Sequence, residues 1–420
     1  MNKLALLFPG QGSQAVGMGK NLCKVFPVAH KTFEEANEVL GFDLMKMCFE
    51  GNIEELTRTE NAQPAILTCS VAAFRVYMSE IGVEPVYSAG HSLGEFSALT
   101  CAGAIAFEDA LKIVRKRGRF MQEAAAEGIG SMAAVTNIDR KIIEEECINS
   151  STEDSIVAVS NYNAPDQTVI SGHKDAVDRV TSALEQKGAK IIPLKVSAPF
   201  HSSLMKPAAV KLNEEMRKYA YNSFKWPVIS NVTGLPYSDP SKIIENMTQQ
   251  MTAPVQWVES MMFLQSENVN IAIELGAGKV LKNLVKKNSS IIVPYSYDID
   301  EDVKKVKELL KNDDGNIENR ITVVTKCLAA AVCTKNRNWD NEEYQKGVVQ
   351  PYKAIQVMQN ELEANNKMPS IEQMTEALNL LKSIFDTKKV PIEEQIERFN
   401  DILDKTKTKD LFPDFVKDLH

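Results

Sequence analysis

The sequence lacks paired cysteines and an excess of positive charge. Its seven cysteines are scattered, and none lies in a Cys-x-x-Cys pair, which argues against a disulfide framework and against a zinc site. Lys and Arg total 48 against 56 Asp and Glu, and the net charge of -8 argues against a nucleic-acid partner. These absences favour a cytoplasmic protein with reduced thiols and no metal.

Membrane and secretion signals are also missing. No apolar run approaches the ~18 residues that a membrane-spanning helix needs. The start, MNKLALLFPGQGSQ, has only a short apolar run before Pro9, whereas a signal peptide needs ~7–15 apolar residues. We therefore expect no membrane association, and a chain of 420 residues allows two or three domains.

Ser92 is the first candidate for chemistry. It lies in Gly90-His91-Ser92-Leu93-Gly94, between PVYSAG, which we interpret as a strand, and EFSALTCAGAI, which has helical composition. A serine on a tight glycine turn between a strand and a helix is the context of a nucleophile elbow. The motif alone is short, and the alternative is that Ser92 is merely a small residue in a turn.

A serine nucleophile needs a base, and histidine is the usual one near neutral pH. Of the five histidines, His201 in SAPFHSS is the best placed, because it follows the point where the chain returns to the main body. The basic segment KIVRKRGRFMQEA is usually a solvated helix face. One of its arginines could instead point inward and bind a carboxylate through two parallel hydrogen bonds.

The order of expected elements divides the chain into domains. Residues 130–196 have the order strand, helix, strand, strand, helix, strand, which is typical of a ferredoxin-like subdomain. We expect it to be inserted into an α/β body made of residues 1–129 and 197–310. A polar, turn-rich stretch from 311 precedes an all-helical extension, 311–420, of unknown role, in which Ser370 and Gln373 form an expected capping box.

A second class of function rests on the loop after the first strand. Gly10-x-Gly12-x-x-Ala15 loosely matches a dinucleotide-binding fingerprint, with Glu34 and Glu35 about twenty residues further on. A nicotinamide-dependent oxidoreductase is therefore a remote alternative. It leaves the candidates described above without a task.

Seven segments occur together in one order: FPGQGSQ, GHSLGE, RKRGRFMQ, SAPFHSSLMKPA, SNVTG, MTAPVQW and ELGAGKVL. In this combination the chain resembles the malonyl-CoA:acyl carrier protein transacylase family from about Leu4 to Pro294. It resembles most the discrete, trans-acting acyltransferases of bacterial polyketide and hybrid lipopeptide synthesis. The resemblance implies an α/β-hydrolase-like body with an inserted ferredoxin-like subdomain.

The resemblance also implies a role for each matching residue. Ser92 would be the acylated nucleophile and His201 its general base. Arg117 would bind the malonyl carboxylate, and Phe200 would add bulk where an α-methyl branch sits, which favours malonyl over methylmalonyl. The other implied groups belong to the main chain: N–H groups of Gln11 and Leu93 as the oxyanion hole, and the carbonyl of Gln250 as the group that orients the base.

Substrates and partners follow from the same resemblance. The donor would be malonyl-CoA, the acceptor would be the phosphopantetheine thiol of an acyl carrier protein, and no cofactor is implied. The C-terminal helices could brace the body or dock onto a synthase module. An editing acyl hydrolase is the alternative within this fold; such relatives tend to lack the arginine at the clamp position, so Arg117 favours the transferase.

Overall fold

The computed structural model describes residues 3–125, 129–194, 196, 198–313, 322–365, 369–406, 408–412 and 415–416. It is a mixed α/β protein that divides into two compact units, Met1–Glu308 and Leu309–His420. The expected polar stretch from residue 311 begins inside a helix, α14 (Asp300–Asp313), and residues 314–321 lie outside the described part.

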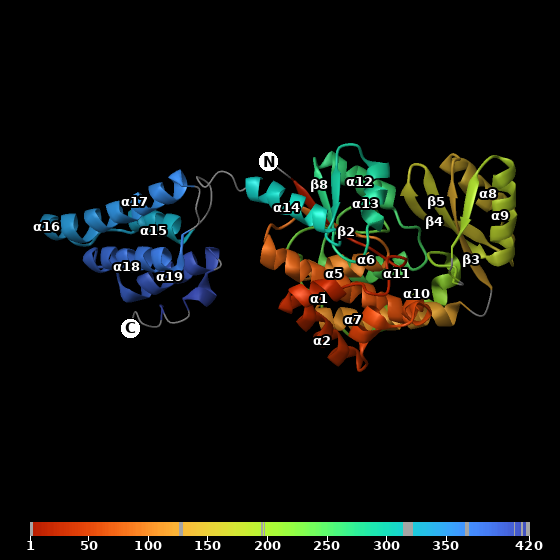
Figure 1. Ribbon diagram of the computed structural model, residues 1–420, viewed down its shortest axis with the longest axis horizontal. Helices are drawn as coiled ribbons and strands as arrows, with labels where there is room; N and C mark the ends of the chain where they lie inside the picture. The colour runs from red at the N-terminus through yellow and green to blue at the C-terminus, as the bar shows by residue number, and fades with distance from the viewer. Residues whose placement is uncertain are drawn as a thin grey trace. The chain divides into compact units, whose positions relative to one another are not determined.

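The first unit is built on a parallel sheet of five strands (Figure 1). Their order across the sheet is β7-β2-β1-β8-β9, and their bounds are β1 Leu4–Phe8, β2 Tyr87–Gly90, β7 Val228–Ile229, β8 Ile271–Glu274 and β9 Val293–Ser296. All five residues of β1, LALLF, are buried. A parallel strand covered on both faces needs such a continuous apolar run, and β1 accordingly lies in the middle of the sheet.

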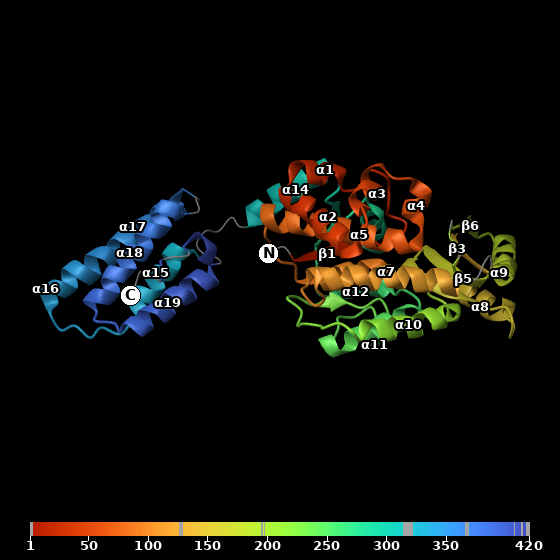
Figure 2. The same ribbon diagram turned by 90° about the horizontal axis from the view of Figure 1, so that it is seen from below.

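Helices cover this sheet and carry the loops at its edges. The chain runs through α1 Lys20–Val25, α2 Pro27–Leu40, α3 Leu44–Glu50, α4 Ile53–Thr57, α5 Thr59–Glu80, α6 Leu93–Cys101, α7 Phe107–Ala124, α10 Lys206–Met216, α11 Ile243–Gln250, α12 Trp257–Ser266, α13 Val280–Asn288 and α14. Two short 3-10 turns, Ser203–Met205 and Pro240–Lys242, precede α10 and α11. Helix α7 packs against α5 on one side and α10 on the other (Figure 2).

A second, antiparallel sheet lies at one end of the first unit (Figure 1). Its elements occur in the order expected from the sequence: β3 Gly130–Thr136, α8 Arg140–Ser150, β4 Val157–Ala164, β5 Gln167–His173, α9 Lys174–Gln186 and β6 Lys190–Pro193. The strands are arranged β4-β5-β3-β6 across the sheet. The sequence predicted the last strand as far as residue 196, but β6 stops at Pro193.

The second unit is helical in its described part. Its elements are α15 Val323–Cys333, α16 Asn341–Tyr344, a π turn Gln345–Val349, α17 Gln350–Ala364, α18 Ile371–Thr387, α19 Ile392–Lys405 and a 3-10 turn Lys409–Leu411. The predicted capping box is present at the start of α18, where Ser370 and Gln373 bond each other's backbone N–H groups. The apolar stripes of α18 and α19 pack as predicted, with the rings of Phe385 and Phe399 5.4 Å apart.

Candidate active site

Ser92 lies on the turn between β2 and α6, as the sequence predicted. Its backbone has φ 52° and ψ −107°, a strained conformation for a residue with a side chain. The flanking glycines make the turn possible: a Cβ on Gly94 would lie 1.9 Å from the Phe8 carbonyl oxygen, and one on Gly90 would lie 1.9 Å from Gly94. The G-x-S-x-G spacing therefore reflects steric need on both sides of the serine.

His201 lies against this turn although it is 109 residues away in sequence. Its Nε2 is 2.8 Å from Ser92 Oγ, and its Nδ1 is 2.7 Å from the main-chain oxygen of Gln250. The carbonyl can only accept, so Nδ1 carries the proton and Nε2 is free to accept the serine proton. Burial, reinforced by the charge of Arg117, lowers the His201 pKa to about 3, so the imidazole is held neutral.

Arg117 is the inward-pointing arginine of α7. Only 1% of it is exposed, and its Nη2 lies 3.3 Å from Ser92 Oγ and 3.0 Å from Gln250 Oε1. Burial lowers the Arg117 pKa to about 10, which still leaves the group charged at neutral pH. Its Nε is buried and has no hydrogen-bond partner within the described part of the chain. A buried cation with unused donors is suited to an anionic ligand.

The other basic residues of α7 behave as an ordinary solvated face. Lys112 and Arg119 form surface ion pairs with Glu108 and Glu60, at 2.5 Å and 3.0 Å. Lys116 pairs with Glu215. Of the basic residues in this helix, Arg117 is thus the one that contacts the candidate nucleophile.

Two buried residues support the site that the sequence analysis did not single out. Asn231 accepts a hydrogen bond from the Ser92 N–H at 2.6 Å and donates one to the Gly90 carbonyl at 2.6 Å, so it fixes both ends of the turn. Glu95, on α6, accepts from the Asn231 N–H, the Gln250 side chain and the Tyr237 hydroxyl. Burial raises the Glu95 pKa to about 7, against the lowering effect of these donors. Both residues belong to quoted segments, SNVTG and GHSLGE, and that was the available signal.

Gln11 and Phe200 line a small cavity beside the catalytic residues. It has a volume of about 260 Å³ and is also bordered by Arg58, Thr59 and Gln122. The N–H groups of Gln11 and Leu93 donate to no acceptor among the described residues. These two N–H groups are therefore available to a ligand oxygen.

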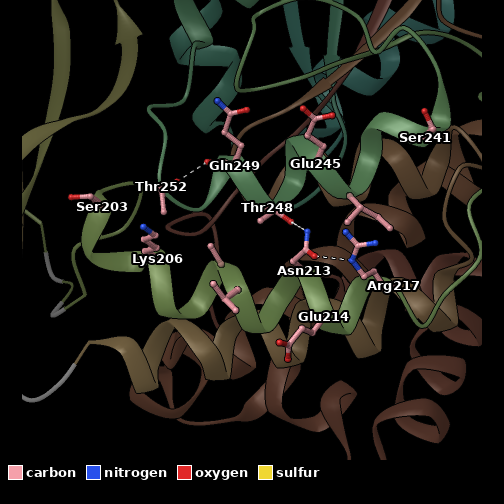
Figure 3. A pocket seen from close by; sticks show the side chains of 13 residues that line it. Ser203, Lys206, Asn213, Glu214, Arg217, Ser241, Glu245, Thr248, Gln249 and Thr252 are labelled. Atoms are coloured by element: carbon pink, nitrogen blue, oxygen red, sulfur yellow. Dashed lines mark hydrogen bonds between the residues drawn. The ribbon is translucent and has the colours of Figure 1, made fainter.

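A larger groove of about 930 Å³ lies between α10 and α11 (Figure 3). Gln249 and Thr252 line it, whereas the neighbouring Gln250 is 1% exposed and faces the catalytic serine. The residues that line the groove include none of the predicted catalytic ones. Volume alone therefore does not locate the chemistry, which lies where the nucleophile, base and cation meet.

The dinucleotide alternative is not supported by the loop after β1. A dinucleotide fingerprint opens directly into a helix whose N-terminus faces the phosphates, but the first helix here begins only at Lys20. Gly10 instead packs against the nucleophile turn, where an added Cβ would lie 2.2 Å from the His91 carbonyl oxygen. Glu35 forms an ion pair with Arg75.

Searches for other classes of site gave two results. The described residues contain no group of three His, Cys, Asp or Glu side chains arranged to hold a metal ion. Within the same described ranges, no helix is long and apolar enough to cross a bilayer.

Comparison with known proteins places the site in a family. Residues 5–325 match the family described as "Acyl transferase domain". The chain belongs to this acyl transferase family. Among curated relatives, a malonyl CoA-acyl carrier protein transacylase of Bacillus subtilis is 40% identical and covers 94% of this chain and 99% of its own length. The transacylase of Escherichia coli K12 is 44% identical and covers 68% of this chain and 93% of its own length.

Solved structures of the family agree. A type II PKS acyl-carrier protein complex with its malonyl-transacylase includes a chain 39% identical to this acyl transferase, with a TM-score of 0.71, covering 73% of this chain and 100% of that one. The malonyl CoA-acyl carrier protein transacylase from Coxiella burnetii is 37% identical, with a TM-score of 0.72, covering 74% and 98%. The resemblance stated from the seven segments is thereby confirmed.

Proposed function

We propose that this acyl transferase moves malonyl from malonyl-CoA, through an ester on Ser92, to the phosphopantetheine thiol of an acyl carrier protein. The malonyl-CoA:acyl carrier protein transacylase activity rests on relatives 40–44% identical over most of their length. The observation that carries the residue roles is that Ser92 Oγ lies 2.8 Å from His201 Nε2 and 3.3 Å from the Arg117 guanidinium. A nucleophile, a neutral base and a carboxylate-binding cation thus meet at one oxygen atom.

The reaction proceeds in two halves. Ser92 Oγ attacks the thioester carbonyl while His201 Nε2 takes the serine proton, and the C–S bond breaks as His201 returns that proton to the CoA thiolate. In the second half the carrier thiol gives its proton to His201 and attacks the Ser92 ester. The Gln11 and Leu93 N–H groups stabilise the carbonyl oxygen in both halves, and one such donor is worth about 3 kcal/mol in other enzymes.

Mass spectrometry of the protein after incubation with malonyl-CoA tests this function. We expect a stable mass increase of one malonyl group, mapped to the peptide that contains Ser92, and its loss when a carrier protein with a free pantetheine thiol is added. Free malonate as the main product in the presence of carrier would favour the editing hydrolase instead. No adduct on any residue would contradict the proposal.

We propose the finer fold assignment on the same basis. The parallel sheet with a strained serine after β2 supports an α/β-hydrolase-like body of residues 1–129 and 197–310. The strand order β4-β5-β3-β6 supports a ferredoxin-like subdomain over residues 130–196. No cofactor is needed for this chemistry, and the scattered free cysteines keep a cytoplasmic location as our expectation.

Phe200 is the proposed selector between malonyl and methylmalonyl. It precedes the base, is 8% exposed and lines the cavity that contains Gln11. Replacing Phe200 by Ser is expected to weaken discrimination against methylmalonyl-CoA roughly tenfold, because one methyl group in a tight pocket accounts for an effect of that size. Competition between the two thioesters for loading measures it. Phe200→Leu, which keeps most of the bulk, is the control, and equal discrimination in Phe200→Ser and wild type would contradict the assignment.

The helical extension is proposed to be an independent domain that loading does not require. The Bacillus subtilis 168 relative matches over its whole length but covers only 75% of this chain, whereas the first relative's 94% must include most of the extension. The second unit also has its own core around Phe385 and Phe399. A role in docking onto a synthase module fits a part that some relatives lack.

A chain ending after α14 tests this division. We expect it to fold and to load malonyl within about threefold of the full chain, because distant units contribute independently. Transfer to carrier is measured in parallel, and slower transfer with normal loading would indicate docking. Failure of the shortened chain to fold, shown by loss of a cooperative thermal transition, would indicate that the extension braces the body.

A further inference from the structure

The side chain of Gln250 lies between two buried groups of opposite charge. Its Oε1 accepts from Arg117 Nη2 at 3.0 Å, and its Nε2 donates to Glu95 Oε2 at 2.7 Å. The three side chains are buried, with Gln250 and Arg117 1% exposed and Glu95 fully covered. Among the described residues, Glu95 and Arg117 form no direct ion pair although each influences the other's charge state.

This arrangement needs an explanation, because buried opposite charges ordinarily pair directly. A direct pair with Glu95 would occupy the donors of Arg117 that a malonyl carboxylate has to use. Glu95 would then act as an internal competitor of the substrate. The Gln250 amide satisfies one oxygen of Glu95 and one donor of Arg117, so both groups remain bonded while they are kept apart.

We propose that the Gln250 side chain is a positioning residue that keeps Glu95 away from Arg117, so that the guanidinium stays free for the acyl carboxylate. The main chain of the same residue accepts from His201 Nδ1, and it is fixed by the end of α11 rather than by the side chain. The side chain and the main chain of Gln250 therefore act on different halves of the site. This inference rests on the proposed malonyl loading of Ser92.

The separation can be tested because the main-chain carbonyl survives any substitution. In Gln250→Ala the space opens and Glu95 reaches Arg117, so single-turnover loading of Ser92 from malonyl-CoA should fall at least about tenfold. Inactivation by phenylmethylsulfonyl fluoride, a neutral serine reagent that needs only the serine and its base, should stay within about threefold of wild type. Gln249→Ala is the matched control, because Gln249 is exposed and lines the groove on the other side of α11 (Figure 3).

The double variant Glu95→Gln/Gln250→Ala provides the decisive comparison. If Glu95 competes with malonyl, removing its charge should restore loading at least about fivefold over Gln250→Ala, and Glu95→Gln alone completes the cycle. A purely structural role for the amide predicts no rescue. Gln250→Ser, which keeps a hydroxyl in the vacated space, replaces the alanine variant if that protein fails to fold.

Each remaining outcome decides the matter. A double variant no faster than Gln250→Ala would overturn the inference, and so would unchanged loading in Gln250→Ala. Equal losses toward malonyl-CoA and the neutral reagent would also overturn it, because the damage would then lie in the serine and base. A wild-type protein without a malonyl ester would overturn the proposed function itself, whereas a loaded wild type without rescue overturns this inference alone.

Discussion

Replacing Ser92 by alanine is expected to lower malonyl transfer to carrier protein by at least about 10⁴-fold, because removal of a serine nucleophile costs this much or more in serine hydrolases. Ser92 Oγ is the atom on which His201 and Arg117 converge. No other hydroxyl replaces it, since the strained turn that presents it depends on Gly90 and Gly94. Transfer is measured as malonyl-carrier formed, and loading as the mass of the intact protein.

Ser97 offers a matched control for this variant. It lies on the same helix, α6, and is fully buried, but its hydroxyl has no hydrogen-bond partner within the described part of the chain. Ser97→Ala should therefore transfer malonyl at the wild-type rate and be no less stable, because it removes an unsatisfied buried polar group. Transfer by Ser92→Ala at more than a hundredth of the wild-type rate would exclude an ester on this residue as the main route.

The difference between Ser92 and Ser97 illustrates what the sequence could predict. A strand, a glycine turn and a helix are local features, and their apolar patterns were sufficient to predict the turn that carries Ser92. The order of elements in residues 130–196 was predicted for the same reason. His201 and Arg117 needed the family resemblance, because a lone histidine or a basic helix has a bland interpretation of its own.

The polar network behind the site was not predicted, because it depends on contacts between distant segments. Glu95, Asn231 and Gln250 come from α6, the loop after β7 and the end of α11, and their hydrogen bonds exist only once the parallel sheet is assembled. No local periodicity reports such contacts. The polar composition from residue 311 similarly predicted a boundary, yet α14 continues to Asp313 because helix formation tolerates charged residues on an exposed face.

Arg117→Ala is expected to lower malonyl loading by about 10²–10³-fold, since a charge-assisted, bidentate contact to a buried carboxylate is worth about 3–4 kcal/mol. Acetyl loading, which offers no carboxylate, should change by less than about tenfold. The ratio of the two rates is therefore the quantity to measure, by single-turnover loading of Ser92 from each thioester. Arg119→Ala is the control on the same helix, because Arg119 is exposed and pairs only with Glu60.

Stability must be followed alongside this ratio. Removing Arg117 leaves Glu95 buried without an opposite charge, a loss of about 3–5 kcal/mol in other buried pairs, and the raised pKa of Glu95 lets that carboxyl take up a proton instead. Arg117→Lys keeps the charge but not the two parallel donors, so it should remain folded and still discriminate poorly. Equal losses of malonyl and acetyl loading in both variants would mean that Arg117 holds the nucleophile in place rather than selecting the acyl group. A selective loss of malonyl loading in the folded lysine variant would assign the selection to the planar guanidinium itself.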